Sequence, residues 1–144
     1  MDYVRLAYRW IAVITLACGI GIYAFFRNTD NMILFRFFSK PGFLNGLPFH
    51  TDTGNFAVSV FVFHGPNMLW LLSGLFFIRS VWIANKKWMQ IYLIIFFLFA
   101  ITNEVAQMSP GIPGTFDVLD VFFLCLIAFM ESVIFHFFVN RRIK

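Results

Sequence analysis

Residues 116–139 read FDVLDVFFLCLIAFMESVIFHFFV, and this stretch decides the fold. It is long enough to cross a bilayer, which needs about 20 mostly apolar residues for a helical span. Polar side chains interrupt it at only five places: Asp117, Asp120, Glu131, Ser132 and His136. Because lipid offers no partner for backbone N–H and C=O groups, such a segment crosses as an α-helix. The sequence therefore predicts an all-α membrane protein.

The composition of the whole chain points to the same class. Of the 144 residues, 60% are hydrophobic and 12% are charged, against roughly 45–50% and 25% in ordinary soluble domains. A soluble domain of this size buries only about two-thirds of its surface, so it could not hide so many apolar side chains. High hydrophobicity excludes a disordered chain, and the presence of only two cysteines excludes a secreted disulfide scaffold.

Three further stretches are long and apolar enough to span. Together with the first, the expected spans are residues 8–26, 66–84, 88–107 and 116–139. Tyr8 and Trp10 suit an interfacial aromatic belt. Pro66 suits the first turn of a helix, where its missing N–H costs nothing. We expect a polytopic four-transmembrane-helix bundle that forms a single domain over residues 1–144.

The chain between the first two spans is less regular. Residues 31–47 are Phe-rich but broken by basic residues, Pro41 and two glycines, which favours an extracytoplasmic amphipathic segment on the membrane surface. Residues 55–64 are too short to span. They could form a buried loop, a short strand, or extra turns of the second helix, kinked at Gly65–Pro66.

Basic residues near the helix ends predict the orientation. Three would lie on one side of the membrane, and eight would lie on the other: Arg5, Arg9, Arg79, Lys86, Lys87, Arg141, Arg142 and Lys144. The more basic side is expected to be cytoplasmic, which places both termini there. The net charge of +4 is thus explained by topology and by contacts with membrane lipids, and we expect no nucleic-acid partner.

Three acids share one face of the last span. At about 100° per residue, Asp120 lies about 60° and Glu131 about 40° from Asp117, on the same side. With a rise of about 1.5 Å per residue, Glu131 lies about 21 Å below Asp117, and Arg79 about 20 Å below Pro66. Matching depth predicts a structural ion pair between Arg79 and Glu131. The competing interpretation is that Arg79 snorkels to the cytoplasmic interface.

A second group of polar residues is expected at the opposite, outer end of the bundle. Three helix ends contribute to it: His64, Asn67, Glu104, Gln107, Asp117 and Asp120. These residues could form an interhelical hydrogen-bond network, a site for the polar headgroup of a lipid or drug, or a site for a divalent cation. Asp117 alone also suits a helix N-cap. No spacing is diagnostic of a metal site, and no cofactor motif is present.

The same residues carry a family resemblance. Residues 104–107 (EVAQ), a Pro/Gly turn, and then residues 116–121 (FDVLDV) resemble the E-x-x-Q and D-x-x-D elements of VanZ-like membrane proteins. His64 stands where that family has a His near the start of the second helix. Gly114 stands where the family usually has an Arg, so the Asp pair would instead meet His64, Arg36, Lys40 or a cation.

The resemblance implies a non-enzymatic cell-envelope role in the bacterial cytoplasmic (inner) membrane, of the type associated with teicoplanin resistance. Two alternatives stand beside it. The chain could be a small accessory subunit with a protein partner or a homo-oligomer, or it could be a membrane enzyme that acts on a lipid-linked substrate. Paired carboxylates with His64 permit acid–base chemistry, but the sequence has no nucleophile, zinc-protease or Walker motif.

Overall fold

The computed structural model describes residues 2–26, 56–109 and 116–139 and is all-α over these ranges. The helices are α1 (Asp2–Phe26), α3 (Phe56–Trp82), α4 (Lys86–Ala106) and α5 (Val118–Ile134), followed by a π-helical turn, η2 (Phe135–Val139). The four α-helices are long and apolar enough to cross a membrane. The predicted four-helix architecture is therefore confirmed, whereas the amphipathic segment expected at 31–47 lies outside the described residues.

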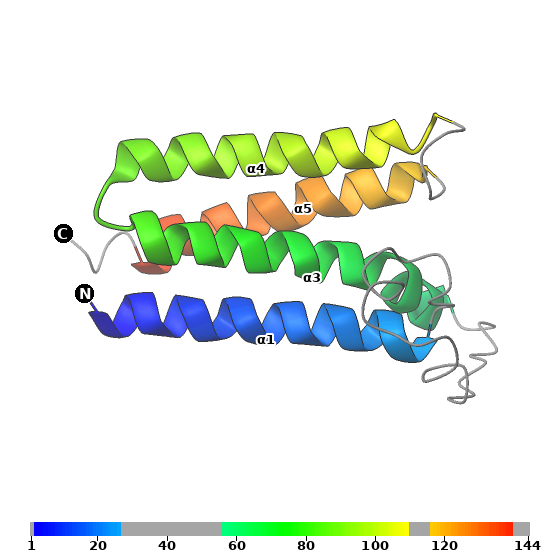
Figure 1. The fold of residues 1–144 in the computed structure, drawn as a ribbon, viewed down its shortest axis with the longest axis horizontal. Helices are drawn as coiled ribbons and strands as arrows, with labels where there is room; N and C mark the ends of the chain where they lie inside the picture. Colours follow the sequence, from blue (N-terminus) through cyan, green and yellow to red (C-terminus); the bar gives the residue numbers. More distant parts are fainter. Residues whose placement is uncertain (1, 27–55, 110–115, 140–144) are drawn as a thin grey trace, which may run out of the picture.

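Helix α3 is the centre of the bundle, because it packs against α1, α4 and α5 (Figure 1). Successive helices run in opposite directions. As a result, α1 and α4 begin at the same end of the bundle at which α3 and η2 finish. We call this the terminal end. At the other end, which we call the loop end, α1 and α4 finish and α3 and α5 begin (Figure 1).

The outward faces of the helices are apolar. On α4, for example, the side chains of Ile94, Ile95, Leu98 and Phe99 are 56–60% exposed. A soluble monomer rarely exposes a continuous apolar patch of more than a few hundred Å². These faces fit contact with membrane lipids, as the composition predicts.

The second span begins ten residues earlier than predicted. Helix α3 starts at Phe56, so residues 56–64 are extra helical turns, and the placement of Pro66 in the first turn was wrong. Within lipid, continuing the helix satisfies the backbone groups of these residues better than a loop or strand would. Pro66 is buried inside α3, close to Gly19 of α1. Proline is tolerated within membrane-spanning helices when neighbouring groups or local adjustments satisfy the backbone carbonyl that it leaves unpaired.

The other boundaries shift for local reasons. Helix α4 begins at Lys86 because the side chain of Asn85 caps it, accepting a hydrogen bond from the Trp88 N–H. Helix α5 begins at Val118 because Asp117 is its N-cap, and the predicted span to residue 139 ends in the π-helical turn. Helix α1 extends back to Asp2, six residues before its predicted start.

Tyr8 does not belong to an interfacial belt. It is buried, and its ring packs 5.4 Å from that of Phe76 on α3 and 6.3 Å from that of Phe135 on η2. Trp10, in contrast, is 60% exposed. Tyr8 thus closes the terminal end of the bundle by joining α1 to α3 and η2.

Small residues set how closely α3 approaches its neighbours. A Cβ atom at Gly19 would lie 3.3 Å from the Cβ of Leu69 and 3.4 Å from the carbonyl oxygen of Pro66, so α1 meets α3 closely there. Ser73 adds a hydrogen bond of 2.8 Å from its hydroxyl to the carbonyl oxygen of Ala12 on α1. Close backbone approach and interhelical hydrogen bonds replace the hydrophobic effect as the source of helix association in lipid.

Gly74 makes room for an aromatic ring on α4. A Cβ atom at this position would overlap the ring of Phe96, which packs 5.1 Å from the ring of Trp70. We expect Gly74→Ala to destabilise the protein by about 1–3 kcal/mol, the usual effect of overpacking a core. Thermal unfolding in detergent would measure the loss.

Gly21→Ala is the matched control, because a Cβ atom there would meet nothing within 4 Å. It should leave the unfolding temperature unchanged or raise it slightly, since Ala favours helix more than Gly does. Equal effects of the two substitutions would contradict the close contact between Gly74 and Phe96.

Candidate functional site

Two groups of buried polar side chains lie in the bundle, one near each end. The group at the terminal end is an ion pair between α3 and α5. The Nε and Nη2 atoms of Arg79 donate to the Oε1 and Oε2 atoms of Glu131, over 2.5 and 2.7 Å. Arg79 is 4% and Glu131 3% exposed. The pair that matching depth predicts is thus present, and Arg79 does not snorkel to the interface.

The surroundings of this pair are apolar and close-fitting. The guanidinium carbon of Arg79 lies 3.8 Å from the centre of the Phe135 ring, a cation–π contact. Its Nη1 atom lies 4.0 Å from the sulfur of Met89 on α4. Both oxygens of the Glu131 carboxylate are occupied by the bidentate contact, so this site has its partners inside the protein.

Removing one partner of this pair would leave an unpaired charge in an apolar setting. We expect Arg79→Leu and Glu131→Leu each to destabilise the protein by roughly 3–5 kcal/mol. The double variant should recover most of the loss, because it removes both charges. The free energy of unfolding of all four proteins, measured in mixed micelles, gives the coupling between the two residues. If the double variant is no more stable than the less stable of the two single variants, Arg79 and Glu131 do not form a structural pair.

The group at the loop end begins with a second link between α3 and α5. The Nδ1 atom of His64 lies 2.8 Å from the Oδ1 atom of Asp120, and both residues are buried. The sequence places His64 and Asp120 in this group but does not single out their pairing. Helix α5 presents Asp120, Leu124 and Glu131 as its buried residues, which confirms that Asp120 and Glu131 face into the bundle.

Glu104 contributes the third buried group, from the end of α4. It is 3% exposed. Its Oε2 atom lies 3.5 Å from the side-chain Nε2 of Gln107, a long hydrogen bond. Its Oε1 atom is buried and makes no hydrogen bond of normal geometry to a described residue, although the backbone N–H of Asp117 lies near enough to act on the carboxylate. The charges of Asp120, Asp117 and His64 act on this carboxylate, so Glu104 belongs to the same cluster as the His64–Asp120 pair.

The remaining two predicted members differ in role. Asp117 caps α5, because its Oδ1 accepts a hydrogen bond of 2.8 Å from the Leu119 N–H. Asn67 is half-buried and lies one turn after His64 on α3. We call His64, Glu104, Gln107, Asp117 and Asp120 the loop-end cluster. Arg36 and Lys40, the other candidate partners of the Asp pair, lie outside the described residues.

A metal centre is not supported by this arrangement. In the described ranges, no three His, Cys, Asp or Glu side chains lie so that they could hold a metal ion together. The carboxylates are instead distributed between a cap, a His contact and an orphaned acceptor.

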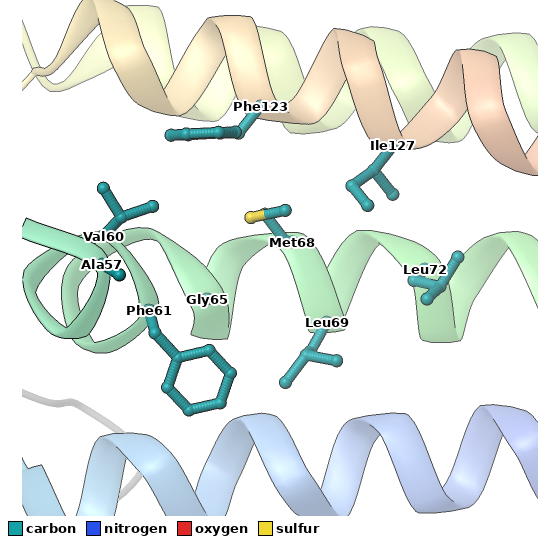
Figure 2. Close-up of a pocket in the computed structure, with 9 residues that line it drawn as sticks. All are labelled: Ala57, Val60, Phe61, Gly65, Met68, Leu69, Leu72, Phe123 and Ile127. Atoms are coloured by element: carbon teal, nitrogen blue, oxygen red, sulfur yellow. The ribbon is translucent and has the colours of Figure 1, made fainter.

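An apolar groove lies beside the loop-end cluster (Figure 2). It has a volume of about 480 Å³ and is lined by side chains of α3 and α5. One of these, Phe123, also packs against His64, with ring centres 5.4 Å apart. The groove was not predicted from the sequence, because its volume depends on how α3 and α5 pack against each other. It also missed Phe135, which the spacing of four residues from Glu131 could have indicated.

The chain matches no protein-family model, no curated protein and no solved structure. Inferences about function therefore start from the geometry of the two buried groups and the groove.

The two roles open to Asp117 can be separated by substitution. We expect Asp117→Ala to destabilise the protein by about 1 kcal/mol, because the first turn of α5 loses its cap. Asp117→Ser keeps a capping oxygen and removes the charge, so it should stay close to the wild type in unfolding temperature. If Asp117→Ser is as unstable as Asp117→Ala, the charge matters rather than the cap.

Proposed function

We propose that this chain is a non-enzymatic, VanZ-like protein of the bacterial cell envelope. In this proposal the loop-end cluster binds the ammonium-bearing headgroup of a lipid or of a glycopeptide. The protein spans the cytoplasmic membrane with both termini in the cytoplasm, so the loop end faces outward. The supporting pattern is the excess of basic residues toward the terminal end, including Arg5, Arg9, Lys86 and Lys87.

The observation that carries the proposal is the Oε1 atom of Glu104, which is buried and makes no hydrogen bond of normal geometry within the described ranges. A buried acceptor without a donor costs roughly 1–3 kcal/mol, and more when the group is charged. The contrast with Glu131 is direct, because both oxygens of that carboxylate meet Arg79. A donor from a ligand would relieve the deficit at Glu104.

The charge of the loop-end cluster favours a cationic donor. Glu104, Asp117 and Asp120 contribute carboxylates, whereas His64 is the only basic residue of the cluster. A primary ammonium group carries three N–H donors, as the side chain of Lys does. It can therefore meet the Glu104 oxygen and offset the surplus of negative charge at once. The side chains of the cluster are carboxylates, an amide and an imidazole, all of which can accept hydrogen bonds from a ligand.

The experiment exploits two lipids with the same net charge. Phosphatidylethanolamine has an ammonium that donates hydrogen bonds, whereas the quaternary ammonium of phosphatidylcholine has no N–H. The wild-type protein, equilibrated with equal amounts of both in mixed micelles, should retain phosphatidylethanolamine at least about tenfold more, the effect of ~1.4 kcal/mol. Native mass spectrometry of the protein–lipid complexes measures the ratio.

Glu104→Gln should abolish this preference while the protein stays folded. Asp2→Asn is the matched control, because it removes one carboxylate at the terminal end, where the side chain is 95% exposed. A second arm tests the other source of an ammonium group. Cells that express the wild type, Glu104→Gln or Asp2→Asn are compared for teicoplanin susceptibility. Protection lost only in Glu104→Gln would identify the drug as the source.

The two arms together decide the proposal. If the wild type shows neither a lipid preference nor protection, or if Glu104→Gln matches the wild type in both arms, the loop-end cluster does not bind an ammonium headgroup.

A further inference from the structure

The groove beside the loop-end cluster is apolar throughout its lining. Side chains and backbone of α3 supply most of the wall and α5 supplies the rest: Ala57, Val60, Phe61, Gly65, Met68, Leu69, Leu72, Phe123 and Ile127. Figure 2 shows Met68 and Val60 on the side of α3 that faces Phe123 and Ile127, while Phe61 and Leu69 point toward α1. The groove thus follows α3 and has α5 along one side.

A space of this kind in a membrane protein has a natural occupant. Its volume of about 480 Å³ falls in the range of roughly 300–1,000 Å³ that is typical of small-molecule sites. Empty apolar space forfeits the dispersion contacts of the atoms that line it. Because the groove runs along membrane-spanning helices, the acyl chains of membrane lipids surround it and can fill it.

The dimensions favour a thin chain over a helix of another subunit. An α-helix with its side chains is at least about 10 Å wide, so two turns of it occupy roughly 850 Å³. Closely packed membrane helices also need small residues at the contact. The groove offers only Ala57 and Gly65 of that kind, among large side chains such as Phe61, Leu72 and Ile127.

The groove also adjoins the loop-end cluster. Phe123 lines the groove and packs on the ring of His64, which in turn binds Asp120. Gly65, the neighbour of His64 in the chain, lines the groove as well. The groove therefore touches the cluster through Phe123 and Gly65, on the side of His64 and Asp120.

We propose that the groove binds one hydrocarbon chain of a membrane lipid whose ammonium headgroup lies at the loop-end cluster. The ligand class is therefore an ammonium-bearing lipid, not a water-soluble drug. This inference rests on the proposed function, because it assigns the chain of the same ligand whose headgroup meets Glu104.

The test uses phosphatidylethanolamine that carries a photoreactive diazirine in one acyl chain. After irradiation of the full-length protein in mixed micelles, mass spectrometry locates the labelled residues. We expect labels on the groove residues Met68, Leu72 and Ile127. Leu72→Trp and, as an independent second variant, Ile127→Trp fill the groove. Each should reduce groove labelling at least about tenfold, because every buried CH₂ that is displaced weakens binding about fourfold.

Ile94→Trp is the matched control, since it adds the same bulk to an outward face of α4, where Ile94 is 60% exposed. It should leave groove labelling unchanged. Unfolding temperatures of all variants show which of them keep the fold. Labels confined to outward faces, or labelling of the groove that both Trp variants leave intact, would overturn the inference. So would a wild-type dimer that the Trp variants convert to monomers, or crosslinks that place residues 27–55 in the groove.

The outcomes separate the two proposals. If Glu104→Gln loses the headgroup preference but the groove is never labelled, the proposed function stands and the chain-binding groove fails. If instead the phosphatidylethanolamine and phosphatidylcholine probes label the groove equally, and Glu104→Gln leaves the labelling by both probes unchanged, the proposed headgroup site at the loop-end cluster is wrong. Both proposals are supported only if Glu104→Gln removes the preference for phosphatidylethanolamine and the two Trp variants remove the labels from the groove.

Discussion

A charge inside a bilayer needs a partner within the protein, and this constraint fixes how α3 and α5 meet. The two helices run parallel and are joined at two levels, by His64–Asp120 near the loop end and by Arg79–Glu131 near the terminal end. A slip of one helical turn, about 5.4 Å, would break both contacts at once. Apolar side chains between the two levels, such as Leu71 and Leu124, fill the space but would tolerate other registers more easily. The polar contacts therefore specify one arrangement of the helices.

The two levels differ in how completely their groups are satisfied. At the terminal end, Arg79 and Glu131 form a closed, bidentate pair, and Phe135 covers the guanidinium. At the loop end, Glu104 is as buried as Glu131, but its Oε1 atom makes no hydrogen bond of normal geometry to the part of the chain that the structure describes. A structural site can be complete in the protein alone, whereas a binding site must leave something for its ligand to supply. This difference is the reason for assigning the first site to stability and the second to recognition.

Features that follow from one helix at a time could be predicted from the sequence. Four apolar stretches give the helix count, a shared face groups Asp120 with Glu131, and equal depth pairs Glu131 with Arg79. Features that depend on how closely the helices approach one another could not. Pro66 looked like a helix start because the pattern cannot show that α1 approaches there closely enough to enclose it. The groove could not be predicted for the same reason, since its volume depends on how α3 and α5 pack against each other.

The loop-end cluster carries more acidic than basic side chains, because Glu104, Asp117 and Asp120 meet only His64. His64 meets Asp120, yet the described part of the chain provides no cation for Glu104. Under the proposed function, an ammonium group of the ligand gives Glu104 the donor that Arg79 gives to Glu131 at the other end of the bundle. The same two helices would then hold one carboxylate site that the protein completes by itself and one that the ligand completes.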